Sequence, residues 1–280
     1  MTAPTAQQRV GCDIRSRTLY VASAREETGR LHIARLQQYE RSQEPTADSE
    51  GTSRCFVLPD SDGIVKPIIL PTDSRHDIAD LARFELTQGM LDPEEQFHTD
   101  VYPTELAGRF LGALWRHERI TQALGDIANG DLTQLRFFPR SVALARGYLK
   151  FCRPPEGNLH LLLDFSSDGA TVCLLRRRQL LDTATLEAPA TFADTQVVER
   201  FCADLKTLVG FRLSTLVKHE SFSALSAIIV SGDRAPAPDC LQPQFAIPVS
   251  EPQIHQGYFE EELATESIAP WLAALGAIVN

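Results

Sequence analysis

The sequence predicts an α/β protein built from two similar modules. Apolar strand patterns alternate with helical patterns along the 280 residues, and the same strand–turn–strand order starts at Val10 and again at Leu159. The polar stretch Pro154–Asn158 separates the two modules. A chain of this length forms one large or two modest domains. Its composition, 43% hydrophobic and 23% charged, is that of a globular protein and excludes a fibrous or wholly disordered chain.

The first module begins with a predicted antiparallel sheet of three strands. Apolar alternation in Val10–Ile14 and Leu19–Ser23 flanks a polar turn, and Leu31–Tyr39 follows as the third strand. The module then continues with strand, strand, helix, strand, strand, helix, strand and helix, expected over Cys55–Leu58, Gly63–Leu70, Asp73–Met90, Phe97–Tyr102, Gly108–Trp115, Glu118–Ala128, Leu135–Phe138 and Ser141–Phe151.

The second module repeats this order. It starts with the continuous apolar strand Leu159–Asp164, and two more strands are predicted at Ala170–Leu175 and Gln179–Leu186. A long helix over Asp194–Phe211 carries its apolar residues on one face, which is typical of a helix that covers a sheet. Two strands and a closing helix are expected over Ala227–Ser231, Phe245–Pro248 and Phe259–Val279.

Each module opens with a strand that leads through an Asp into a small polar turn. Asp13 occupies this position in the first module and Asp164 in the second, and a third turn, Ser231–Asp233, follows a later strand. Backbone N–H groups and hydroxyls of two facing turns can bind phosphate, while the carboxylates can organise Mg²⁺. From the spacing alone, both aspartates could equally be ordinary turn residues.

The order of these features resembles the PilM family of actin-like ATPases in type IV pilus assembly, and it is similar to the cytoplasmic part of GspL in type II secretion. The segments that carry the resemblance are, in order, Gly11–Ser16, Phe84–Glu85, Leu91–Pro93, Phe110–Leu124, Ser141–Leu149, Asp164–Thr171, Ser231–Asp233 and Ala273–Val279. The resemblance implies a two-lobed actin-like, ribonuclease-H-like α/β fold with a reduced second lobe. Residues 1–152 would form the first lobe with an inserted subdomain of the peptide-binding type, 153–260 the second lobe, and 261–280 a C-terminal helix that returns to the first lobe.

The resemblance also implies a nucleotide site, in vestigial or weak form. The positions that match the family's motifs are Asp13, Arg15, Ser16, Thr18, Asp164, Ser166, Ser167, Gly169, Thr171, Gly232 and Asp233. Asp13 and Asp164 would be the metal ligands if magnesium-ATP binds.

Several residues depart from the family pattern in a way that disfavours a nucleotide. Arg15, Ser166 and Asp233 stand where the family has glycine, and a side chain there obstructs the approach of the backbone to phosphate. Asp168 adds a negative charge, and the sequence suggests only Arg15 and Arg17 as nearby cations. We therefore expect no catalytic residues and no bound cofactor, ATP with magnesium being the one that the fold would imply.

The expected function is a non-catalytic cytoplasmic scaffold of a type IV pilus or type II secretion-like assembly. The resemblance implies a bitopic inner-membrane partner of the PilN type, whose cytoplasmic tail enters a groove in the subdomain that holds Phe97–Tyr102 and Leu111–Trp115. A secretion motor ATPase is a further expected partner. The alternatives are an active actin-fold ATPase or kinase that uses ATP and magnesium, and a filament-forming actin homologue.

Charge and hydropathy exclude other classes of function. The formal net charge of −10 disfavours nucleic acid as a partner, because such binding needs a basic surface. The longest apolar run, Ile268–Val279, is shorter than the ~20 residues that cross a bilayer, so no direct membrane insertion is expected. Met1–Gln8 lacks the apolar core of a secretory signal, and the six cysteines form no CxxC pair, which favours a cytoplasmic location peripheral to the inner membrane through protein partners.

Overall fold

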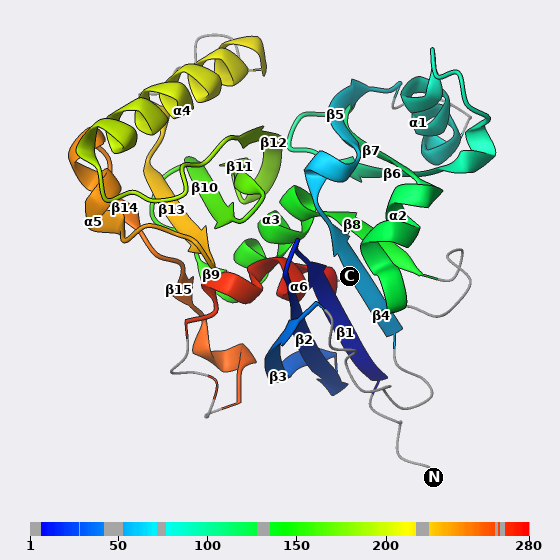
Figure 1. The fold of residues 1–280 in the computed structure, drawn as a ribbon, viewed down its shortest axis with the longest axis horizontal. Coiled ribbons are helices and arrows are strands. Elements are labelled where there is room, and N and C mark those ends of the chain that lie inside the picture. Colours follow the sequence, from blue (N-terminus) through cyan, green and yellow to red (C-terminus); the bar gives the residue numbers. More distant parts are fainter. Residues whose placement is uncertain are drawn as a thin grey trace.

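The computed structural model of the chain describes residues 7–27, 29–41, 53–71, 77–127, 135–216, 224–260, 263 and 267–279. Two five-stranded sheets form the cores of two lobes, and the helices α3 (Arg140–Phe151) and α6 (Leu272–Ala277) lie between them (Figure 1). A smaller three-stranded sheet forms a subdomain beside the first lobe.

The sheet of the first lobe has the strand order β3-β2-β1-β4-β8. The central strand β1 (Gln7–Ile14) is antiparallel to β2 (Thr18–Glu27) and parallel to β4 (Ser53–Leu58). At the edges, β3 (Arg30–Glu40) pairs antiparallel with β2, and β8 (Arg136–Pro139) pairs parallel with β4. The predicted antiparallel arrangement of the first three strands is confirmed.

The sheet of the second lobe has the same topology, in the order β12-β11-β10-β13-β14. The central strand β10 (Leu159–Ser166) is antiparallel to β11 (Gly169–Arg176) and parallel to β13 (Ala227–Gly232). At the edges lie β12 (Gln179–Leu186) and β14 (Val249–Ser250). The two modules predicted from the sequence are therefore present, with Asp13 on β1 and Asp164 on β10 near the ends of equivalent strands.

The subdomain consists of β5 (Ile64–Ile69), β7 (Arg109–Arg116) and β6 (Phe97–Pro103), in that spatial order, with α1 (Ile78–Thr87) packed on them. Its small core is separate from the two lobe cores and consists of Ile68, Leu70, Ala82, Leu86, Phe97 and Leu114. α2 (His117–Leu124) follows and returns the chain to the first lobe.

Close packing of α6 on α3 joins the C-terminal segment to the first lobe. A Cβ atom at Gly147 would lie 2.0 Å from the carbonyl oxygen of Leu272, and one at Gly276 would lie 1.7 Å from that of Ala143. A Cβ at Gly11 on β1 would lie 2.0 Å from the carbonyl oxygen of Ala274. Only glycine permits these backbone contacts, so α6 fits closely between α3 and the first sheet.

The boundaries expected from the sequence differ from the structure in several places. The helix predicted over Asp73–Met90 is α1 from Ile78 to Thr87, and residues 73–76 and 128 of the predicted helices lie outside the described residues. Of the predicted closing helix Phe259–Val279, the described residues form a 3₁₀ turn at Ala269–Trp271 followed by the short α6, and Pro270 disfavours a longer helix toward the N-terminus. The predicted strand Phe245–Pro248 is irregular, and the pairing instead uses β14. The long helix α4 (Thr195–Leu216) covers the second sheet as expected, and the remaining elements are α5 (Pro238–Leu241), β9 (Cys152–Arg153) and β15 (Gln253–Ile254).

Among the helices within the described ranges, none combines the length and apolar character needed to cross a membrane. All six cysteines lie in described segments, and no disulfide links any of them.

Candidate functional site

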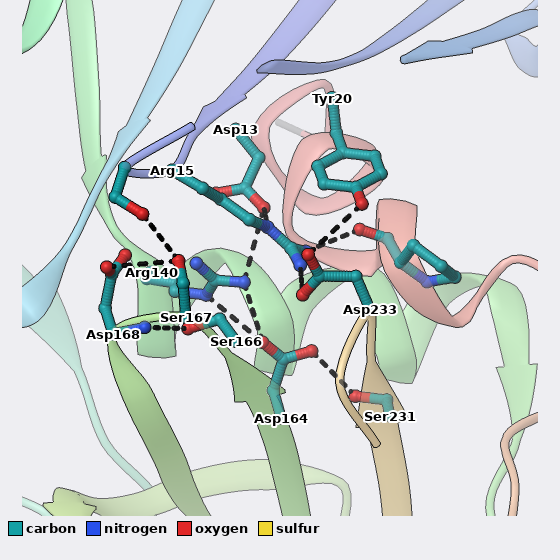
Figure 2. A network of polar contacts seen from close by, with 12 residues as sticks. Asp13, Arg15, Tyr20, Arg140, Asp164, Ser166, Ser167, Asp168, Ser231 and Asp233 are labelled. Atoms are coloured by element: carbon teal, nitrogen blue, oxygen red, sulfur yellow. Dashed lines mark hydrogen bonds and ion pairs between the residues drawn. The ribbon is translucent and has the colours of Figure 1, made fainter. Parts of the chain in front are cut away.

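The turns of the two Asp-bearing hairpins meet between the lobes. The hydroxyl of Ser16, in the β1–β2 turn, lies 2.6 Å from the hydroxyl of Ser167, in the β10–β11 turn. Figure 2 shows these turns on either side of a network of carboxylates and guanidinium groups. The hairpins thus face each other, and they touch at their tips.

Arg15 fills the space behind the first turn. Its side chain is almost fully buried, and Nε donates to Oδ2 of Asp13 at 3.0 Å. Nη1 donates to Asp233 and Nη2 to the carbonyl oxygen of Pro270 at 2.7 Å, while the guanidinium lies 4.2 Å from the ring centroid of Tyr20. Every nitrogen of this guanidinium therefore has a partner, and the contacts join both lobes and the C-terminal segment.

Arg140 lies on the other side of Asp13 and pairs with the second lobe. Its Nε and Nη2 donate to the same oxygen of Asp164, at 3.1 and 2.8 Å, and Nη2 lies 3.5 Å from Oδ2 of Asp13. The side chain is 2% exposed. Arg140 is the first residue of α3, where the helix dipole disfavours a cation, so the two carboxylates must compensate.

The second oxygen of Asp164 accepts a hydrogen bond from the Ser231 hydroxyl at 3.0 Å. Burial opposes the charged form of Arg140, but the adjacent Asp13 and Asp164 outweigh it and raise the pKa of Arg140 above its ordinary value. Burial, with the carboxylate of Asp233 adding to it, raises the pKa of Tyr20 to about 12, so its hydroxyl stays protonated and donates to Asp233 at 3.3 Å. The buried carboxylates of Asp13 and Asp164 are thus paired with guanidinium groups, while the second oxygen of Asp13 is buried without a hydrogen-bond partner among the described residues.

The structure brings the other sequence-predicted residues to the same region. Thr18 closes the first turn through its carbonyl oxygen, which accepts from the Arg15 N–H at 2.9 Å. Ser166 and Gly169 form the second turn, and Thr171 pairs with Asp164 across the hairpin. The remaining predicted position, Gly232, has a φ of +105° and lies against Phe165, where a Cβ would be 2.0 Å from the carbonyl oxygen.

The expectation that Arg15 and Arg17 are the nearby cations is right for Arg15 and wrong for Arg17. Arg17 is exposed on the first turn, and the second cation of the network is Arg140. Asp168 is exposed at the tip of the second hairpin, where its carboxylate accepts from the Ser167 hydroxyl at 3.2 Å and its N–H donates to Ser166 (Figure 2). An arginine at a helix start, where lysine and arginine are disfavoured, is the signal in the sequence that could have pointed to Arg140.

A second candidate site lies in the subdomain. A pocket of about 360 Å³ opens between β5, β7 and the segment before β6, with an apolar lining from Ile64, Met90, Phe97 and Leu114. Arg119, Asp62 and Arg116, which pairs with Asp92, are its charged lining residues.

Within the described part of the chain, no group of three or more His, Cys, Asp or Glu residues is arranged to hold a metal ion. No family model matches the sequence, and no curated protein matches it.

Solved structures do match. A chain of the PilM–PilN type IV pilus biogenesis complex superimposes with a TM-score of 0.65 at 14% identity, covering 98% of each chain. A Bacteroides thetaiotaomicron protein of unknown function with an actin-like ATPase fold gives 0.51 at 10% identity, covering 94% of this chain and 95% of that one. This chain has the actin-like ATPase fold. Its likeness to the chain of the PilM–PilN complex extends over almost its whole length.

A third structure is less similar. The cytoplasmic domain of EpsL, an inner-membrane component of the type II secretion system of Vibrio cholerae, gives a TM-score of 0.42 at 12% identity over 79% of this chain and 81% of that one.

Proposed function

We propose that the chain is a non-catalytic scaffold of a type IV pilus or type II secretion-like assembly. It would bind the cytoplasmic tail of a bitopic inner-membrane protein of the PilN type and remain cytoplasmic, peripheral to the membrane through that partner. The full-length likeness to a chain of the PilM–PilN complex supports this role. A motor ATPase of the same assembly is a further partner in this proposal.

The observation that carries the non-catalytic part is the buried position of Arg15 between Asp13 and Asp233. A magnesium-triphosphate would need the carboxylates as metal ligands and the space between the turns for its phosphates. Arg15 and Arg140 already neutralise these carboxylates, and the Ser16–Ser167 contact closes the gap between the turns. The residues present therefore do not fit magnesium-ATP.

An active ATPase or kinase, the competing function, would need a carboxylate able to accept a proton from water or substrate. Asp13 and Asp164 are the candidates, but each is buried and bound to a guanidinium. A base held in this way is poorly suited to proton transfer. The same network argues against a filament that assembles in response to ATP.

We assign the tail to the apolar pocket of the subdomain. An extended peptide binds by placing a few apolar side chains in a preformed groove. Ile64 and Met90 offer partly exposed apolar surface at this pocket, and Phe97 and Leu114 form its buried wall. Arg119 can donate to a carbonyl or carboxylate oxygen of the peptide beside these apolar positions.

A matched pair of variants on β5 tests the tail site. Ile64 lines the pocket, whereas Ile69 is 72% exposed on the same strand and lies outside the lining. The probe is a synthetic peptide of the cytoplasmic tail of the bitopic protein encoded nearest to this chain's gene. We expect saturable binding by fluorescence anisotropy, weakened at least about tenfold by Ile64→Glu and unchanged by Ile69→Glu. Absence of binding to the wild type, or equal effects of the two variants, would contradict the proposal.

A further inference from the structure

A second pocket lies between the lobes, against the turn of the β10–β11 hairpin. Its volume is about 440 Å³, within the range of small-molecule sites. The first lobe contributes Asp60 and Ser61, and the second contributes the turn 166–171 and the segment 185–188, which includes the end of β12. Arg140 lines it as well, so the pocket adjoins the ion-pair network but is separate from the Arg15 contacts.

Arg140 lines this pocket and carries one donor that no described residue uses. Its Nε and Nη2 bind Asp164, but Nη1 is buried and has no hydrogen-bond partner among the described residues. In Figure 2 this nitrogen lies on the side of Ser167, away from Asp164. A buried N–H group without an acceptor is unfavourable, so an oxygen from outside the protein is the natural partner.

The charge around the pocket determines whether the acceptor for Nη1 belongs to a charged or a neutral group. Asp13, Asp164 and Asp233 already outnumber Arg15 and Arg140 in the network. The pocket adds further carboxylates, from Asp60, Asp168 and Glu187. A phosphate or carboxylate would be repelled by this surplus of negative charge. The acceptor for Nη1 must then belong to a neutral group.

Hydroxyl groups can pair both with the unused donor of Arg140 and with the carboxylates of the pocket. A hydroxyl oxygen can accept from Arg140, and a hydroxyl hydrogen can be donated to a carboxylate. The lining supplies its own hydroxyls from Ser61, Thr171 and Thr185, and Pro59 and Leu186 provide apolar surface for C–H groups.

We propose that this interlobe pocket binds a small neutral polyhydroxylated molecule, with one hydroxyl oxygen accepting from Nη1 of Arg140 and other hydroxyls donating to Asp60 and Asp168. Such a ligand contacts both lobes and adds to the contacts that hold them together. The site is independent of the tail pocket, so either proposal can fail without the other.

Saturation-transfer-difference NMR on the full chain tests the pocket. The probes are glycerol, myo-inositol, D-glucose and D-mannitol, each at low millimolar concentration, with glycine as a zwitterionic probe and sodium sulfate as an anionic competitor. Thr185→Trp would fill the pocket from an exposed position, and Gln179→Trp places the same side chain at an exposed position at the other end of β12. If Thr185→Trp does not fold, Thr185→Leu takes its place.

We expect a saturable signal from at least one polyol, reduced about tenfold by Thr185→Trp and retained in Gln179→Trp. Sulfate should not displace the polyol. The proposal is overturned if no polyol gives a signal, if the two variants behave alike, if glycine alone binds, or if sulfate competes.

Discussion

Arg140 donates two hydrogen bonds to one oxygen of Asp164, at 3.1 and 2.8 Å, and thereby joins the start of α3 to the central strand of the second lobe. The same guanidinium lies 3.5 Å from Asp13, on the central strand of the first lobe. Two aspartates at equivalent positions of a duplicated fold are therefore connected through a protein side chain. The guanidinium of Arg140 thus supplies positive charge between the two lobes.

Removing Arg140 should destabilise the fold strongly. Arg140→Ala leaves Asp164 buried without its cation, and breaking a buried pair in this way costs about 3–5 kcal/mol. The matched control is Arg116→Ala, because Arg116 pairs with Asp92 while half exposed, where such a pair contributes less than about 1 kcal/mol. Urea unfolding at pH 7 measures both. Similar losses for the two variants would contradict a structural role for the interlobe pair.

The contact between α3 and α6 should tolerate no side chain at Gly276. A Cβ there would lie 1.7 Å from the carbonyl oxygen of Ala143, so Gly276→Ala forces the backbones apart and should cost about 3 kcal/mol. Gly210, inside α4, has open space within 4 Å of the place that a Cβ would take, and Gly210→Ala should stabilise by about 1 kcal/mol through helix propensity. Thermal melting compares the two, and a neutral Gly276→Ala would refute the close packing.

Asp182 should make stability depend on pH. It is buried on β12, and burial raises the pKa of its carboxyl, although Arg212 at 3.5 Å and Arg109 oppose the shift. The folded state then binds the proton more tightly than the unfolded state, in which the pKa of an Asp is about 3.9. This contribution to stability is fully present below the unfolded pKa and is lost as the pH rises through the raised folded value.

Asp182→Asn removes this titration. We expect the variant to gain stability relative to the wild type when the pH is raised from 4 to 7, as measured by urea unfolding of both proteins at each pH. A difference between variant and wild type that stays constant with pH, or shrinks on raising it, would show that burial does not control this carboxyl.

The duplicated sheets and the Asp-bearing turns could be predicted from the sequence, because strand periodicity and a following polar turn are local signals. Asp13 and Asp164 each end an apolar run and precede small polar residues. The two lobes and the actin-like fold follow from the order of such local units, and this part of the prediction is confirmed by the structural comparisons.

The partners of those aspartates could not be predicted in the same way. Arg140 is 24 residues from Asp164 in sequence, and Arg15 is 218 residues from Asp233, so no local pattern relates them. The apolar character of the closing segment favours a long helix. In the described residues, its apolar side chains instead pack into the first lobe from the short α6 and from the non-helical residues beside it. This arrangement depends on tertiary contacts, which a local sequence pattern does not record.

The most direct test is calorimetric titration of the full chain with ATP in the presence of Mg²⁺. With Arg15 and Arg140 bound to the carboxylates and the two turns in contact, we expect no saturable heat at millimolar ATP. A micromolar dissociation constant that depends on magnesium would contradict the claim that side chains of the protein occupy the nucleotide cradle.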